Sequence, residues 1–180
     1  EAHVTPNPMG DGEYIPMDWN LKKYGQLSLI WKPTVTTKVK FSHFSDDVDF
    51  QEYDRYYKLN PDGNLLKYRA GQTNLLQLNK TISRTSFYTL GIVKNNKTYN
   101  HRSFNNFSNY IHEDYNTQNT PAYSFSVGGA NQNIFERETI SSTIKFDYTN
   151  QINNFHQLKF GLSYKGHRIN YKNINLRYYV

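Results

Sequence analysis

Histidine and carboxylate side chains are the groups in this chain that could bind a metal or transfer a proton. Zinc sites take their ligands from short characteristic spacings, and no His-x-x-Glu-His or comparable pattern occurs. The chain contains no cysteine, which excludes disulfides, thiolate metal sites and cysteine nucleophiles. The sequence therefore predicts no metal site from its irregularly spaced histidines, which include His43, His101, His112, His156 and His167.

Two acidic groups suggest a bound cation. One is His112-Glu113-Asp114, and the other is Asp46-Asp47 with Asp49 nearby. A single short run rarely provides a full coordination shell, and the glycine and terminal glutamate of a calcium loop are missing. We interpret both groups as solvated loop residues, so we expect neither a metal nor another cofactor.

Acid–base or nucleophilic catalysis has little support in the sequence. Glu136, Glu138 and Asp147 could supply paired carboxylates, but nothing places any two of them across a substrate. No Gly-x-Ser-x-Gly motif is present, and Gly128-Gly129 is too short for a phosphate loop. We therefore expect no enzymatic activity.

The composition favours strands whose apolar residues alternate with polar ones. Hydrophobic residues make up 37% of the 180 residues and aromatic residues 16%, with 16 Tyr and 11 Phe. The mean hydropathy of −0.82 is too low for an ordinary core. A membrane β-barrel needs apolar residues only at alternate strand positions, so it tolerates such a value. The net charge of +6 is spread along the chain in small groups such as Lys22-Lys23, which predicts no nucleic-acid binding.

Alternation is clearest in residues 156–165, where Leu158, Phe160, Leu162 and Tyr164 fall on one predicted face. Residues 140–148 alternate in the same way. Two earlier pairs of segments repeat the pattern, around Leu76 with Leu90 and around Leu27 with Phe41. The sequence thus predicts about six strands, each of roughly 9–12 residues, close to the length that crosses a bilayer at a tilt.

The connections between these segments alternate between short and long. Short turns are expected near 32–36, 83–86 and 149–155, and long connections at about 45–71 and 95–137. Bacterial outer-membrane barrels have short periplasmic turns and long extracellular loops. We therefore predict an all-β fold of antiparallel transmembrane barrel strands. Six strands are fewer than the smallest such barrel has, about eight.

Three segments resemble the TonB-dependent receptors of outer membranes, especially the large Bacteroidetes-type ones. Residues 141–161 resemble their strand–turn–strand, with the turn Asp147-Tyr-Thr-Asn-Gln151 and the following His156-Gln-Leu-Lys-Phe-Gly161. Residues 81–90 are similar to a second hairpin of the family, and residues 12–20 to a loop preceding a barrel strand. On this resemblance, residues 1–180 are a segment of the barrel domain, and the plug domain and the signal peptide are absent.

The resemblance implies a barrel of about 22 strands, filled by a plug, in the bacterial cell outer membrane. Such a receptor binds cargo at the cell surface and imports it with energy from the inner membrane. The expected partners are outer-membrane lipid, the TonB energy-transducing complex through the missing N-terminal region, and an unidentified siderophore, vitamin, glycan or peptide. This segment would supply wall and loops and would do no chemistry.

Aromatic residues in the predicted outer loops could stack on cargo. They are Tyr53, Tyr56, Tyr57, Tyr110, Tyr115, Tyr123 and Phe125. Four further rings, Tyr88, Phe146, Tyr148 and Tyr164, fit an interfacial girdle at the level of the lipid headgroups.

Two other functions compete with transport. A soluble or surface-attached β-sandwich that binds carbohydrate or acts as an adhesin would also alternate along its strands. It would need two apolar faces stacked about 10 Å apart. An outer-membrane protease or lipase barrel would need a catalytic constellation, and the sequence offers none.

Overall fold

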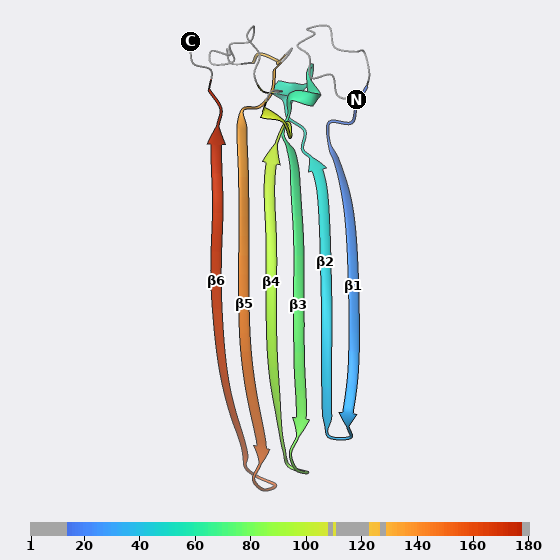
Figure 1. Ribbon diagram of the computed structural model, residues 1–180, viewed down its shortest axis with the longest axis vertical. Coiled ribbons are helices and arrows are strands. Elements are labelled where there is room, and N and C mark those ends of the chain that lie inside the picture. The colour runs from blue at the N-terminus through green and yellow to red at the C-terminus, as the bar shows by residue number, and fades with distance from the viewer. Residues whose placement is uncertain (1–13, 108–109, 111–122, 127–128, 178–180) are drawn as a thin grey trace.

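Each strand of the protein pairs with its neighbour in the sequence. The computed structural model describes residues 14–107, 110, 123–126 and 129–177. In this part of the chain, six antiparallel strands form one sheet in the order β1-β2-β3-β4-β5-β6 (Figure 1). The strands are β1 (Trp19–Thr34), β2 (Thr37–Gln51), β3 (Leu66–Thr81), β4 (Ser86–Arg102), β5 (Asn133–Gln151) and β6 (Gln157–Asn175). The predicted all-β, antiparallel fold is confirmed; the sheet is open, with β1 and β6 at its edges.

Short and long connections lie at opposite ends of the sheet, as Figure 1 shows. The short turns are residues 35–36, 82–85 and 152–156. The long connections, 52–65 and 103–132, leave from the other end. The first of them contains two single-turn helices, η1 (Arg55–Tyr57) and η2 (Pro61–Gly63). The predicted alternation is therefore confirmed, and we call the two ends the turn end and the loop end.

The strands are longer than the sequence pattern predicted, at 15 to 19 residues each. The extra residues lie mostly toward the loop end. There Asp46, Asp47 and Asp49 belong to β2 and pair with β3, whereas the sequence placed them in a loop. Backbone pairing does not depend on which face carries the apolar side chains. Val48 and Phe50 lie on the face opposite to that of Val39 and Phe41, so the alternation of the first half of β2 does not extend into this stretch.

Two rows of apolar side chains cross all six strands on one face of the sheet. The register joins Trp31, Val39, Leu78, Leu90, Phe146 and Leu162 in one row, and Leu29, Phe41, Leu76, Ile92, Ile144 and Tyr164 in the next. We call these two rows the apolar band. The predicted faces of residues 140–148 and 156–165 are confirmed, because Phe146 lies opposite Leu162 and Ile144 opposite Tyr164.

The predicted aromatic girdle is spread over three rows. Tyr88 and Tyr148 lie opposite each other in the row on the turn side of the apolar band. Phe146 lies one row further, with its ring 5.9 Å from that of Tyr88, and Tyr164 lies in the row after that. Lys80, the one cation in the row of Tyr88, donates from Nζ to Thr37 Oγ1 at 2.8 Å, which directs its charge toward the turn.

A bulge near the end of β1 disturbs the register at one point. Trp31 lies opposite Val39 and Thr34 opposite Thr37, so β1 has one residue more than β2 between these pairs. Pro33, expected in the turn, belongs to this part of β1. Its missing N–H is tolerated because Pro33 lies in the bulge, where the ladder is already interrupted.

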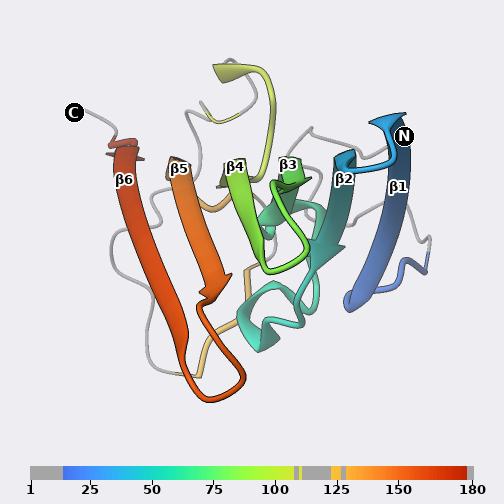
Figure 2. The same ribbon diagram turned by 90° about the horizontal axis from the view of Figure 1, so that it is seen from below.

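A single layer makes up the described sheet. The contacts between strands and helices run only between neighbouring strands and between η1 and η2, so no second sheet or helix layer covers either face in the described residues. The apolar band is consequently accessible. In the inner strands Ile92 is 41% and Ile144 48% accessible, and in the edge strands Trp31 is 66% and Leu162 61% accessible. Figure 2 shows the sheet from its turn end, with the strands side by side in sequence order.

Candidate functional site

The two long connections join over the loop end of the sheet. The amide of Ser126 donates to Tyr56 O at 2.7 Å, and the amide of Asn131 donates to Gly63 O at 2.8 Å. Asn60 Nδ2 donates to Gly129 O at 2.8 Å, and Ser103 Oγ donates to Gly63 O at 3.1 Å. We call this set of bonds the loop junction. It makes the described parts of the two connections one unit.

Local hydrogen bonds hold the connection 52–65 in shape. The Asp54 carboxylate accepts from the amide of Tyr56 at 2.9 Å and so caps η1. Pro61 stands at the start of η2, where its missing N–H costs nothing. Asn64 Nδ2 donates to Glu52 O at 3.0 Å, which closes the segment on itself.

Two tyrosines are buried in this region. Tyr57 is 7% accessible, and burial raises the pKa of its phenol well above the ordinary value of 10.0; the charges of Tyr56 and Asp54 add to the increase. Tyr110 is 2% accessible and packs with Ala130 and Ile134. Its hydroxyl donates to Phe104 O at 3.0 Å and accepts from Phe104 N at 2.9 Å. Both rings stabilise the loops from within.

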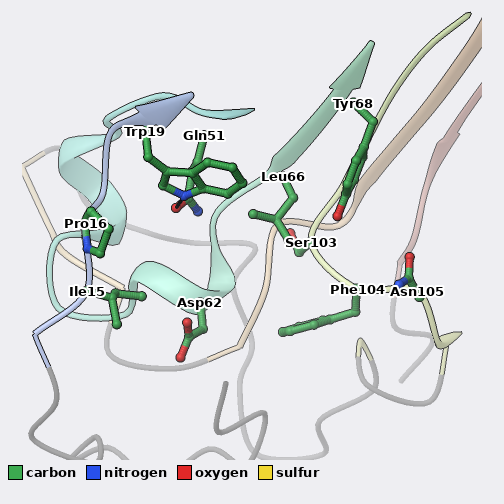
Figure 3. Close-up of a pocket in the computed structure, with 10 residues that line it drawn as sticks. All are labelled: Ile15, Pro16, Trp19, Gln51, Asp62, Leu66, Tyr68, Ser103, Phe104 and Asn105. Atoms are coloured by element: carbon green, nitrogen blue, oxygen red, sulfur yellow. Dashed lines mark hydrogen bonds between the residues drawn. The ribbon is translucent and has the colours of Figure 1, made fainter. Parts of the chain in front are cut away.

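A hollow of about 440 Å³ opens beside the loop junction, at the ends of β1, β2 and β3. Trp19, Leu66, Tyr68 and Phe104 supply apolar walls, and Gln51 and Asp62 supply polar groups (Figure 3). Trp19 Nε1 donates to Gln51 Oε1 at 3.3 Å, and Gln51 Nε2 donates to Pro61 O at 3.2 Å. Gln51 therefore links the indole to η2.

The side chains that line this hollow could hold a small molecule. Flat aromatic walls with a few polar groups are typical of small-molecule sites. Among the described residues, no three histidine or acidic side chains lie close enough together to hold a metal ion. Of the carboxylates considered for acid–base work, Glu136 and Glu138 lie on one face of β5, and Asp147 lies on the other face, paired with Lys145 at 2.9 Å. Asp147 therefore does not converge with the two glutamates.

Among the described residues, none of the loop aromatics predicted from the sequence lines the hollow. Tyr57 and Tyr110 are buried, whereas Tyr53 is exposed and Tyr123 is 86% accessible. Phe125 lies under the Arg55 guanidinium at 5.5 Å, and the rings of Tyr56 and Tyr57 meet edge to face at 5.0 Å. Tyr115 and His112-Glu113-Asp114 lie outside the described residues. Cargo contact by these rings stays a prediction.

Sequence reasoning missed the residues that do line the hollow. Trp19 begins β1, Gln51 ends β2 and Leu66 begins β3, so they meet only because the three strand ends coincide. Placing the strand ends correctly would have brought these residues together. The underestimated strand lengths prevented that.

Among the residues that the structure describes, no helix has the length and apolarity that a membrane-spanning helix needs. In comparisons with known proteins, no family model and no curated protein matches the chain.

Replacing Gly63 should loosen the loop junction. A Cβ at Gly63 would lie 2.5 Å from Gly129 O and 2.5 Å from Asn60 Nδ2, and a backbone carbonyl cannot move aside freely. We expect Gly63→Ala to cost about 1–3 kcal/mol locally, as overpacking does. Amide hydrogen exchange at Asn131 should accelerate accordingly. Gly25→Ala is the control, because nothing lies within 4 Å of its added Cβ; equal exchange rates in the two variants would contradict the prediction.

Stability of the loops should fall at high pH because of Tyr57. The pKa of Tyr57 is higher in the folded protein than in the unfolded chain, so Tyr57 ionises first in the unfolded chain as the pH rises. Its contribution to the free energy of unfolding is therefore complete below about pH 10 and is lost at higher pH. Between pH 9 and 11.5, roughly the range in which free phenols titrate, the melting temperature should drop more steeply for the wild type than for Tyr57→Phe. Tyr53→Phe, at an exposed position, should show the same dependence of melting temperature on pH as the wild type. If the melting temperatures of all three proteins fall equally with pH, Tyr57 is not the cause.

Proposed function

We propose that this chain is part of the barrel wall of a TonB-dependent outer-membrane receptor, which binds cargo at the cell surface and imports it with energy from the inner membrane. The observation that carries the proposal is the apolar band, which crosses six strands and has no protein layer packed against it in the described residues. In water such a surface is costly, because every Å² of exposed apolar area costs about 25 cal/mol. Contact with lipid tails removes that cost.

The apolar band covers about half the height of the lipid-facing belt of an outer-membrane barrel. Its two rows and the adjoining row of Tyr88 and Tyr148 occupy roughly 14 Å of strand length. Outer-membrane barrels carry an apolar belt of about 25 Å flanked by aromatic residues. On the loop side of the band, the next two rows of this face combine apolar and polar side chains. Leu27 lies in one of these rows and Ile140 in the other, each among polar neighbours.

The topology also supports a barrel. Each strand follows its neighbour up and down, with short turns at one end and long connections at the other. The outer edges of β1 and β6 carry backbone groups that no described strand pairs. In a membrane these groups must be paired, which closure with further strands would achieve.

The assignment to TonB-dependent receptors comes from the sequence resemblance. The most similar segment, residues 141–161, forms the end of the β5–β6 hairpin, and residues 81–90 form the β3–β4 turn and its continuation. Both lie where the family's motifs would place a turn between two barrel strands. The proposed place is the bacterial outer membrane, and the proposed partners are its lipid, the TonB complex and a cargo that meets the loop end.

The alternative is a soluble or surface-attached sandwich that binds carbohydrate or acts as an adhesin. The hollow with Trp19 and Tyr68 would suit it, since aromatic walls bind sugars as well as other flat ligands. A sandwich, however, would require a second sheet on the apolar band, and the described sheet is a single layer. We therefore prefer the barrel.

The two tryptophans should report differently on contact with lipid. Trp31 lies in the apolar band, and Trp19 lies at the loop end. In vesicles of brominated phospholipid, Trp19→Phe, which keeps Trp31, should lose most of its fluorescence, because bromine quenches only on contact. Trp31→Phe, which keeps Trp19, should retain it. Equal fluorescence of both variants in brominated and ordinary lipid would exclude a lipid-facing band.

Labelling of whole cells should reveal the orientation. The chain has no cysteine, so single cysteines can be placed at the exposed Leu59 in the first long connection and at Val35 in a short turn. We expect a membrane-impermeant maleimide to label Leu59→Cys on intact cells, and Val35→Cys only after the outer membrane is breached. Labelling of both on intact cells, or recovery of the protein in the soluble fraction, would contradict the proposed location.

A further inference from the structure

The face opposite the apolar band is strongly basic. We call it the basic face; within the six strands it carries the cations Lys22, Lys38, Lys40, Lys67, Arg69, Lys97, Arg137, Lys145, Lys159 and Lys165. Its only acidic residues in these strands are Asp46 and Asp147. In the sequence these cations are scattered, and only the register brings them to one face.

The excess of positive charge belongs to this face and not to the sheet as a whole. On the face of the apolar band, the strands carry both signs in similar numbers: Lys23, Lys80, Lys94, Arg102, Arg168 and Lys172 against Asp47, Asp49, Glu136 and Glu138. Neighbours in sequence separate accordingly, since Lys22 lies on the basic face and Lys23 on the other. The asymmetry therefore needs an explanation beyond solubility.

Three of the cations share one row near the loop end. Lys22 lies opposite Val48, which lies opposite Arg69; Arg69 lies opposite Tyr99, and Tyr99 opposite Arg137. Every second strand thus carries a cation, and neighbouring cations of the row stand about 10 Å apart at their Cα atoms, or two strand spacings. We call Lys22, Arg69 and Arg137 the cation row. All three are exposed.

The charges of the cation row are not neutralised by the protein. The ion pairs among the described residues are Lys67 with Glu52 and Lys145 with Asp147, and neither includes a member of the row. Arg137 lies over the Tyr99 ring at 5.7 Å, which orients its guanidinium without cancelling its charge. Asp46 lies one row away, with its carboxylate against Gly71, and has Lys97 two strands across.

We infer that the cation row binds a small solute with two or more anionic groups, such as carboxylates, phosphates or sulfates. Such groups can bridge cations about 10 Å apart, and guanidinium groups hold oxyanions through paired hydrogen bonds. On the turn side of the cation row, the basic face also carries hydroxyl and amide side chains. Among them, Asn95 Nδ2 donates a hydrogen bond to Thr73 Oγ1 at 2.9 Å. These neutral groups add no negative charge to the face.

The role of this site in uptake rests on the proposed function, because in a lipid-embedded barrel the face opposite the apolar band lines the interior. The solute that enters would then be anionic. Binding itself needs only the folded sheet, so it can be measured separately from lipid contact and orientation.

A fluorescent tetra-anion, pyrene-1,3,6,8-tetrasulfonate, tests the site by anisotropy with the full chain in a nonionic detergent. Lys22→Gln/Arg69→Gln/Arg137→Gln should weaken binding by about tenfold or more, because each cation contributes a charge-assisted contact. The matched control, Lys23→Gln/Lys94→Gln/Arg168→Gln, removes the same charge from the opposite face and should change binding by less than about twofold, since screening weakens distant charges.

Equal weakening in both triple variants would show that only net charge matters and would overturn the site. Undiminished binding in the first variant would overturn it too, as would tighter binding of a single-stranded oligonucleotide than of the tetra-anion through the same residues. Circular dichroism of both variants must match the wild type for the comparison to hold. If brominated lipid does not quench Trp31 but the tetra-anion binds as expected, the anion site is supported and the barrel proposal is contradicted.

Discussion

Backbone hydrogen bonding between neighbouring strands is the constraint from which the other features of this protein follow. The described sheet has no second layer to fix its side chains, so the register of the ladder alone decides which residues become neighbours. The side-chain period of two then divides every strand between two faces. One face gathers Leu90 and Phe146 into an apolar band, and the other gathers Arg69 and Arg137 into a cation row. Both surfaces are consequences of the same pairing.

The fold could be predicted well where hydropathy alternates. Leu158, Phe160, Leu162 and Tyr164 identified β6 and its apolar face, and the alternation of short and long connections identified the two ends of the sheet. The strand ends were predicted less well, because near the loop end the apolar positions change face. In β2, Val48 and Phe50 lie on the face opposite to that of Val39 and Phe41, so the alternation does not continue from one half of the strand to the other.

The hollow and the cation row could not be predicted from the sequence, for a related reason. Trp19, Gln51 and Leu66 meet because β1, β2 and β3 have ends at the same level of the sheet. Lys22 aligns with Arg69 because both the β1–β2 register and the β2–β3 register bring them into one row. Errors of one residue in either ladder would have placed these side chains on the wrong face. Loop aromatics were recognisable by type, but only the packing around Tyr57 and Tyr110 distinguishes rings that support the loops from rings that face solvent.

The bulge in β1 shows how the chain can change its length. Inserting one residue in the middle of a strand would exchange the faces of everything beyond it, bringing lysines into the apolar band and leucines among the cations. The extra residue of β1 lies between Trp31 and Thr34, past the last apolar row and next to the turn, where few side chains follow it before the chain reverses. Natural variants of this sequence should therefore differ in length within the connections, at the strand ends or by pairs of residues, while the strand middles keep their parity.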